Sequence, residues 1–252
     1  MQNRDKTTEI RDLWNSVARD WQIQVGSTGD LNRILNSDPV LWSFAGDVAG
    51  RTVLDAGCGT GYLSQQLKDH GAHVVGVDLS ERMLDIARKE CPGIDFRLDS
   101  CSDLRTLEDA QFDLVIANYV LMDTPDLHAA IQSFYRVLKP GGAAVLVFLH
   151  PCFPQGRSVR GGDGTQVTYQ WDSPYFEPRK FVDPPWGHFR ANFIWFHRPL
   201  SDYWKAFRGV GFLIEEFEEP RLTEDRFHLA PDERMLNKSR TRPYSVAFKL
   251  RK

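Results

Sequence analysis

The chain of 252 residues is long enough for one large domain with a buried core, or for one domain that carries an insertion. Its formal net charge of −3 leaves no global basic field to attract nucleic acid or anionic lipid. The charged start, MQNRDKTTEIRDLW, is unlike a signal peptide, and the most apolar run, GGAAVLVFL, is shorter than the about 20 residues of a membrane span. We therefore expect a cytoplasmic protein that binds neither membrane nor nucleic acid.

The N-terminal part of the chain is predicted to be helical. Residues 8–22 carry apolar side chains at spacings of three and four, which is the pattern of an amphipathic helix. A second helical patch follows near residues 30–35, and DPVLWSFAGDVAG leads into the first strand.

From residue 52 onward, apolar runs alternate with amphipathic segments. The expected strands are 52–56, 73–78, 94–99, 112–118 and 143–150. The expected helices between them are 61–70, 81–90, 103–109 and 126–138. Strands joined by helical crossovers form a parallel sheet with helices on both faces, and ligands bind at the carboxyl ends of its strands. The candidate residues on this rim are Gly57–Gly61, Asp78, Asp99, Asn118 and His150.

Residues 151–198 interrupt this alternation. They are rich in proline, glycine and aromatic residues, so they are too long for an ordinary loop and too aromatic for a disordered linker. We expect short strands or turns that cover the rim as a cap. A helix at 200–210 and strands at 212–219 and 244–250 follow.

The glycines of GCGTG, residues 57–61, follow the first strand directly. A dinucleotide-binding loop has the spacing G-x-G-x-x-G, whereas this loop has G-x-G-x-G, which argues against a nicotinamide-dependent oxidoreductase. Asp55 precedes the loop, Asp78 ends the second strand where it can accept hydrogen bonds from a ribose diol, and Asp99 ends the third where it can meet an adenine amino group. Together these features predict a nucleoside-containing cofactor.

With these residues the chain resembles the class I S-adenosylmethionine-dependent methyltransferases. The resemblance rests on VLDAGCGTG, VVGVDLSERMLDIAR, FRLDS, FDLVIANYVL and RVLKPGG, and it covers about residues 50–150. It implies an α/β, Rossmann-like, doubly wound sheet of seven strands, mostly parallel with an antiparallel last strand. It also implies S-adenosylmethionine as cofactor, S-adenosylhomocysteine as product, and residues 50–252 as the methyltransferase domain with its cap at 151–198.

The resemblance also assigns roles along the rim. The glycine loop would lie against the methionine part of the cofactor, Asp78 would hold the ribose hydroxyls, and the ends of strands three and four would meet the adenine and the sulfonium. The expected cofactor-binding residues are Asp55, Gly57, Cys58, Gly59, Asp78, Leu79, Met83, Asp99, Ser100, Asn118 and Tyr119. Residues 1–49, with Trp14 and Trp21, would fold over the cofactor as a helical lid.

The methyl acceptor is less well defined. His150 closes the fifth strand and is the candidate base, because an imidazole accepts a proton near neutral pH; the alternative is a structural role at the Pro151 turn. The aromatic cap suggests a small apolar or aromatic molecule with an O or N nucleophile. The candidate substrate-binding residues are Trp14, Tyr119, His150 and Trp195.

Other interpretations remain open from the residues alone. The chain could hold the cofactor without turnover, or it could methylate RNA or protein. The DPPW tetrapeptide at 183–186 matches the catalytic motif of adenine-N6 methyltransferases, but it lies in the insertion instead of after strand four, so we assign it no role. The four cysteines have no metal-ligand spacing, so we expect reduced thiols and no metal; the sequence does not indicate an oligomeric state.

Overall fold

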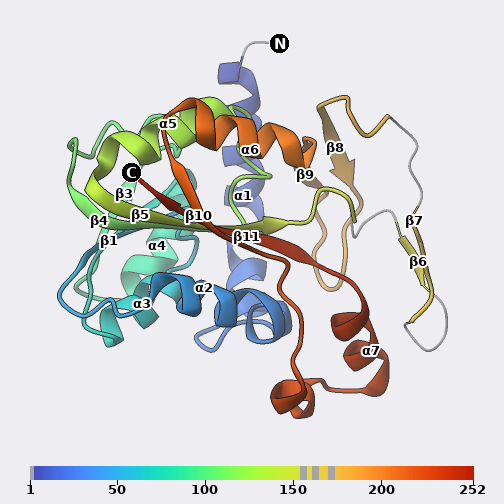
Figure 1. Ribbon diagram of the computed structural model, residues 1–252. Helices are drawn as coiled ribbons and strands as arrows, with labels where there is room; N and C mark the ends of the chain where they lie inside the picture. The colour runs from blue at the N-terminus through green and yellow to red at the C-terminus, as the bar shows by residue number, and fades with distance from the viewer. Residues whose placement is uncertain (1–2, 154–157, 161–164, 170–173) are drawn as a thin grey trace.

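Seven strands form a sheet that runs through the middle of the protein (Figure 1). The structure is a computed structural model that describes residues 3–153, 158–160, 165–169 and 174–252. The strands of the sheet are β1 (Thr52–Ala56), β2 (His73–Asp78), β3 (Asp95–Leu98), β4 (Phe112–Asn118), β5 (Leu138–Leu149), β10 (Leu213–Glu218) and β11 (Ser245–Arg251). Their order is β10-β11-β5-β4-β1-β2-β3, and β11 runs antiparallel to both of its neighbours. The mostly parallel sheet with an antiparallel last strand is thereby confirmed.

Helices cover both faces of this sheet. The helices of the described residues are α1 (Asn3–Val25), η1 (Arg33–Ser37), α2 (Asp38–Ala45), α3 (Tyr62–Asp69), α4 (Glu81–Glu90), α5 (Leu127–Val137), α6 (Leu200–Gly209), η3 (Glu224–Leu229) and α7 (Glu233–Thr241). In Figure 1, α5 and α6 lie on one face of the sheet, and α2 and α3 lie on the other. The strand order reverses between β1 and β4, so the carboxyl ends of these strands diverge there and leave a crevice.

The apolar runs form strands because both of their faces are buried. In β4, the residues from Leu114 to Ala117 are fully buried, as continuous apolar runs in parallel sheets are. The predicted strands at 52–56, 73–78 and 112–118 have the expected bounds, while the fifth strand begins earlier, at Leu138.

The predicted helix at 103–109 does not form. Residues 101–110 make turns, and Leu104 and Ala110 take positive φ angles of 48° and 51°. The turns hold because the carboxylate of Asp99 accepts hydrogen bonds from the backbone N–H and the hydroxyl of Thr106, at 2.7 and 2.8 Å. The crossover from β3 to β4 therefore carries no helix. Conversely, the structure contains the helices η3 and α7, which the apolar pattern did not predict.

The insertion after β5 forms two hairpins that are separate from the main sheet. One pairs β6 (Ser158–Arg160) with β7 (Val167–Tyr169), and the other pairs β8 (Arg179–Asp183) with β9 (Phe193–His197). The loop of the second hairpin brings Phe189 into a cluster with Leu13 and Val17 of α1. The cap residue Trp171 lies outside the described residues.

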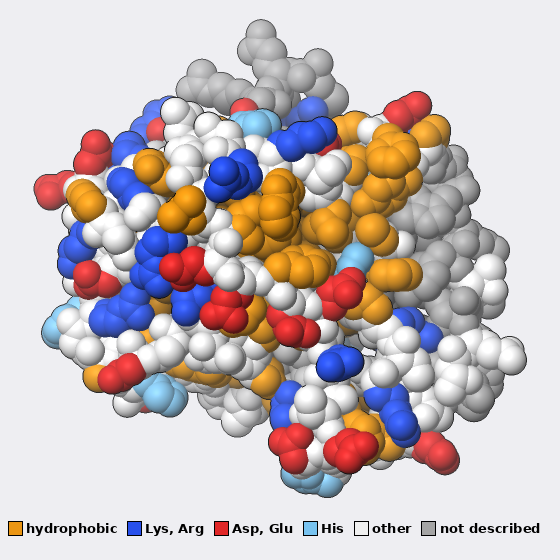
Figure 2. All heavy atoms as spheres, in the orientation of Figure 1, with side chains coloured by type: hydrophobic (Ala, Val, Ile, Leu, Met, Phe, Trp, Pro, Cys, Tyr) orange, Lys and Arg blue, Asp and Glu red, His pale blue; other side chains and the backbone are white. Residues whose placement is uncertain are grey.

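Strand β10 forms one edge of the sheet, and most of its side chains are exposed. Figure 2 shows hydrophobic side chains over α6 and β10, where Trp204, Leu213 and Phe217 are exposed. β10 also carries Glu215 and Glu216, and charges of this kind on an edge strand disfavour pairing with another sheet. None of the helices in the described part of the chain has the length and apolar character needed to cross a membrane.

Candidate functional site

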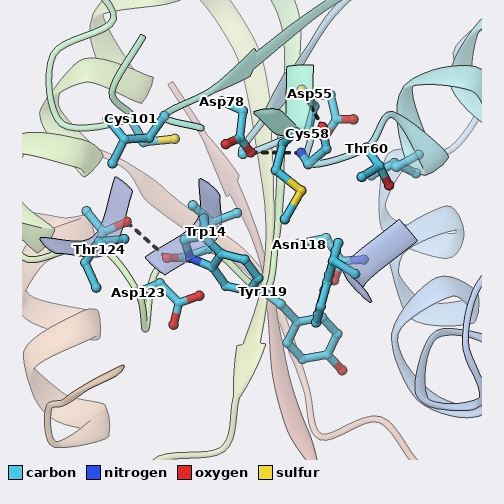
Figure 3. A pocket seen from close by; sticks show the side chains of 18 of the residues that line it. Trp14, Asp55, Cys58, Thr60, Asp78, Cys101, Asn118, Tyr119, Asp123 and Thr124 are labelled. Atoms are coloured by element: carbon cyan, nitrogen blue, oxygen red, sulfur yellow. Dashed lines mark hydrogen bonds between the residues drawn. The ribbon is translucent and has the colours of Figure 1, made fainter. Parts of the chain in front are cut away.

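A pocket opens at the carboxyl ends of β1, β2 and β4. It encloses about 980 Å³ of empty space, part of it open to solvent, and α1 contributes Trp14 and Trp21 to its wall. Figure 3 shows the Asp78 and Cys58 side chains on one side of this pocket and the Asp123 and Tyr119 side chains on the other. The pocket lies at the crevice where the strand order reverses.

The glycine loop after β1 is held by contacts within the chain itself. Gly57 has a φ of 76°, and a Cβ atom at this position would lie 2.3 Å from a methyl carbon of Val120. Gly59 has a φ of 54°, but a Cβ atom there would meet only the Trp21 ring, at 3.7 Å. Packing against the loop after β4 therefore requires glycine at position 57, whereas position 59 is the one that faces the open pocket.

Asp78 occupies the end of β2 beside this loop. Its Oδ2 atom accepts a hydrogen bond from the backbone N–H of Gly59 at 2.9 Å, and its Oδ1 atom accepts one from Ser80 at 2.8 Å. A carboxylate has about four lone-pair sites, so these contacts leave acceptor capacity for a ligand that brings hydroxyl donors. Burial raises the pKa of Asp78, and the backbone N–H groups of Ser80, Gly59 and Leu79 oppose that shift.

Asp55 lies deeper, in β1. Its side chain is buried, and its Oδ2 atom accepts a hydrogen bond from the Ser64 hydroxyl at 2.6 Å. Burial raises the pKa of Asp55 to about 7, and the neighbouring charge of Asp78 adds to the shift. Asp55 therefore ties the strand to α3 while it also lines the floor of the pocket.

The far end of the pocket is more apolar. Met83, which is almost fully buried on α4, lies beside Leu79, Ser100 and Cys101 in the lining. The hydroxyl of Ser80 caps α4 by accepting from Met83 N and also donates to Asn15 of α1 at 2.8 Å. The bond to Asn15 joins the N-terminal helix directly to the wall of the pocket.

Asn118 and Tyr119 follow one another where β4 ends, and both line the pocket. The side-chain Oδ1 of Asn118 is buried and has no hydrogen-bond partner among the described residues. Tyr119 has a positive φ of 59°, which is held by its backbone N–H to Val147 O at 2.7 Å and its hydroxyl to Ser245 at 2.6 Å. Strained backbone and unsatisfied polar groups that persist in a packed structure are typical of ligand sites.

Arg33 brings a positive charge to the same pocket. Its side chain is only 9% exposed, and its guanidinium donates to Asp30 at 3.0 Å. The guanidinium carbon lies 5.3 Å from the Trp21 ring centre and 5.9 Å from that of Tyr119, within the range of cation–π contact. A buried cation beside open space is suited to an anionic ligand group.

The structure brings most of the predicted site residues together. Those that line the pocket are Trp14, Asp55, Gly57, Cys58, Gly59, Asp78, Leu79, Met83, Ser100, Asn118 and Tyr119. Asp99, His150 and Trp195 do not line it. The oxygens of Asp99 are used by Ser100 and Thr106 in the turns after β3.

His150 and Trp195 have partners elsewhere. His150 is 3% exposed, and its Nε2 atom lies 2.6 Å from Oε1 of Glu219, while its Nδ1 atom accepts from the backbone N–H of Cys152. Trp195 donates from its indole N–H to Asp183 at 2.7 Å and stacks on Phe181. Both therefore hold the region around the insertion together, outside the pocket lining.

The expected residue set left out two charged side chains that line the pocket, Arg33 and Asp123. Asp123 follows β4 in LMDTPD, where Asp126 carries the same kind of side chain and caps α5 instead. The sequence offers no signal that tells which of these carboxylates turns inward. For Arg33, which lies in a helical patch, the sequence allows a contact with the cofactor carboxylate, but a solvated side chain is the commoner outcome at such a position.

Comparison with known proteins agrees with this architecture. Residues 54–146 match the family model of a methyltransferase domain. Curated relatives include ubiquinone biosynthesis O-methyltransferases from Coxiella burnetii (34% identical; 56% of this chain, 61% of the relative) and Xanthomonas oryzae (37% identical; 41% and 45%). The chain thus matches about three fifths or less of the length of these relatives.

Solved structures match over more of the chain. An S-adenosylmethionine-dependent methyltransferase from Mesorhizobium loti is 26% identical, with 90% of this chain and 100% of that chain covered and a TM-score of 0.74. A protein described as an enzyme of the same class from Listeria monocytogenes is also 26% identical, with 85% and 95% covered and a TM-score of 0.70. Residues 54–146 therefore belong to the methyltransferase-domain family, and the chain carries this domain in the fold of the class I S-adenosylmethionine-dependent methyltransferases.

Proposed function

We propose that this protein transfers a methyl group from S-adenosylmethionine to an oxygen or nitrogen nucleophile of a small apolar or aromatic molecule. The observation that carries the proposal is the Asp78 carboxylate, which the N–H groups of Gly59 and Ser80 hold at the end of β2 with lone pairs to spare. The pocket beside it combines this acceptor with an apolar end and a buried cation.

The described residues fit the parts of the cofactor in order. Asp78 would accept from both ribose hydroxyls, and Leu79 and Met83 would flank the adenine, with Ser100 at its polar edge. The unpartnered Oδ1 of Asn118 would accept from the amino group of the methionine part. Arg33 would pair with its carboxylate, since a guanidinium matches a carboxylate with two parallel hydrogen bonds.

Methyl transfer from this cofactor requires mainly that the two reactants are aligned. The cofactor supplies a methyl group on a positively charged sulfur, and the residues of this chain bind and orient the two reactants. Holding both at near-attack distance lowers the barrier by about 7–11 kcal/mol. Trp14 and Trp21 of α1 would exclude water from the reaction centre, and we assign residues 1–49 as a lid and 151–198 as a cap on this basis.

The acceptor is assigned to a class only. Trp14 and Tyr119 give the open part of the pocket an aromatic wall, which suits an apolar or aromatic molecule. The names of the O-methyltransferase relatives support an oxygen nucleophile. His150 enters the proposal as a structural residue, because its Nδ1 lone pair is occupied by Cys152 and its Nε2 atom by Glu219.

Calorimetric titration with S-adenosylmethionine, S-adenosylhomocysteine and NADH tests the proposal. We expect micromolar binding of the first two and none of NADH. Asp78→Asn should weaken binding of both by about tenfold or more, because it removes the charge that the ribose hydroxyls donate to. The matched control is Asp85→Asn on the exposed side of α4, which should bind like the wild type. Equal affinity of the Asp78 and Asp85 variants would refute the cofactor site.

A further inference from the structure

The carboxylate of Asp123 enters the pocket from the loop that follows β4. Figure 3 shows its side chain on the side of the pocket opposite Asp78, and Trp14 lines the same pocket. The cofactor contacts proposed above leave Asp123 without a role. The loop that carries it lies against the glycine loop, because Val120 fills the space over Gly57.

The carboxylate has no hydrogen-bond donor among the described residues. Its neighbours in the loop are engaged: the Thr124 hydroxyl donates to Val120 O at 3.0 Å, and the Asp123 backbone N–H donates to the same oxygen. Asp123 is half-buried, and a partly desolvated carboxylate without a donor is costly, so one left unused in the wall of the pocket marks a position where a ligand supplies the donor.

The loop is held rigidly from the other side. Arg198, which is buried, donates hydrogen bonds to the carbonyls of Leu121, Thr124 and Pro125 at 3.2, 2.5 and 3.0 Å. The backbone N–H of Phe196 in β9 also donates to Met122 O at 2.7 Å. These bonds fix the backbone on both sides of Asp123, and among the described residues no ion pair joins the guanidinium of Arg198 to the Asp123 carboxylate.

The electrostatic surroundings favour a proton acceptor. Burial raises the pKa of Asp123 well above its usual value; the charge of Arg198 opposes the shift and that of Asp78 adds to it. Tyr203 of α6 also lies close enough to interact with the charge of Asp123. A carboxylate whose pKa is raised in this way is a stronger base than an ordinary aspartate.

We infer that Asp123 is the catalytic base of the methyl transfer, and that the acceptor presents an O–H or N–H group to it. This inference rests on the proposed function. In the step, the bond between the methyl carbon and sulfur breaks and leaves its electron pair on sulfur. The lone pair of the acceptor forms the new bond to the methyl carbon, and the acceptor's proton passes to the Asp123 carboxylate and from there to solvent. The positive charge that moves from sulfur to the acceptor therefore arrives beside a carboxylate.

The test needs no knowledge of the acceptor. Sinefungin is an S-adenosylmethionine analogue that carries an amine on carbon where the cofactor carries its methyl group on sulfur, so its amine projects toward the acceptor side. A carboxylate there should bind this amine. We expect the wild type to bind sinefungin about tenfold or more tightly than S-adenosylhomocysteine, and Asp123→Asn to lose this preference while its S-adenosylhomocysteine affinity changes less than threefold.

The controls distinguish a failure of the role of Asp123 from a failure of the cofactor site. Asp85→Asn should keep the wild-type preference for sinefungin, and Asp123→Glu, which retains the charge, should keep part of it. A wild type that binds both ligands equally, or an Asp123→Asn variant that retains the preference, would overturn the role of Asp123 while leaving the cofactor site intact. Failure of the wild type to bind either ligand would overturn the proposed function, and the role of Asp123 with it. The comparison of sinefungin with S-adenosylhomocysteine on the wild type tests the role of Asp123 even where the asparagine variant does not fold.

Discussion

The imidazole of His150 and the carboxylate of Glu219 meet at 2.6 Å and join the segment after β5 to the segment after β10. The same imidazole accepts a hydrogen bond from the backbone N–H of Cys152, so both of its nitrogens serve the fold. This contact gives the histidine that the sequence nominates as a base a carboxylate partner 69 residues along the chain.

Replacement of His150 by glutamine should therefore lower stability and leave the cofactor site unchanged. Loss of the bond to Glu219 and of the acceptor for Cys152 should cost about 1–3 kcal/mol of unfolding free energy. Urea unfolding measures the cost, and titration with S-adenosylhomocysteine provides the control. A variant of wild-type stability that no longer turns over an acceptor would instead favour the role of base.

The pH dependence of stability follows from the charge of Asp55. Its folded-state pKa is raised to about 7, from a usual value of 3.8, chiefly by burial. The folded state thus holds its proton more tightly than the unfolded chain, so the stabilisation is full below pH 3.8 and is lost as the pH rises through 7. We expect Asp55→Asn to be more stable than the wild type at pH 8 and to lose this advantage at pH 5. Thermal unfolding at both values measures the difference; an advantage that is independent of pH would contradict the buried charge as its cause.

The glycines of the loop should respond differently to alanine. Gly57→Ala places a Cβ atom 2.3 Å from Val120, and we expect a loss of stability that is larger than the about 1–2 kcal/mol cost of the left-handed backbone alone. Gly59→Ala meets only Trp21 at 3.7 Å, so its stability should fall less, while its affinity for S-adenosylhomocysteine should fall at least as much as that of Gly57→Ala. Chemical unfolding paired with calorimetry checks both. Equal stability of the two variants would show that the loop relaxes around Val120.

The sequence predicts those parts of the fold whose pattern is local. Apolar runs at 52–56 and 112–118 predict buried strands with the observed bounds, and the position of Asp78 at a strand end predicts its place on the rim. The helix expected at 103–109 fails because Asp99 and Thr106, seven residues apart, form a hydrogen bond that stabilises turns instead. Short-range periodicity carries no information on such a bond.

The sequence pattern also does not predict which charged residues enter the pocket. Asp123 and Asp126 are three residues apart in a stretch with no periodic pattern, yet the first enters the pocket and the second caps α5. What separates them is Arg198, which holds the loop from more than 70 residues away in the sequence. A contact over that distance arises only once the chain has folded, so single-sequence patterns cannot rank the two carboxylates.

The contact between α1 and the β8–β9 hairpin has a consequence for kinetics. Trp21 of α1 approaches the glycine loop at Gly59, and the same ring packs on Phe189 of the hairpin, with 6.1 Å between ring centres. Lys180 and Glu9 add an ion pair between the two elements. The helix can move away from the pocket only by breaking this contact. Substitutions in the hairpin should therefore alter the exchange rate of the nucleoside ligand, so that proteins with identical pocket residues could differ widely in how long they retain their product.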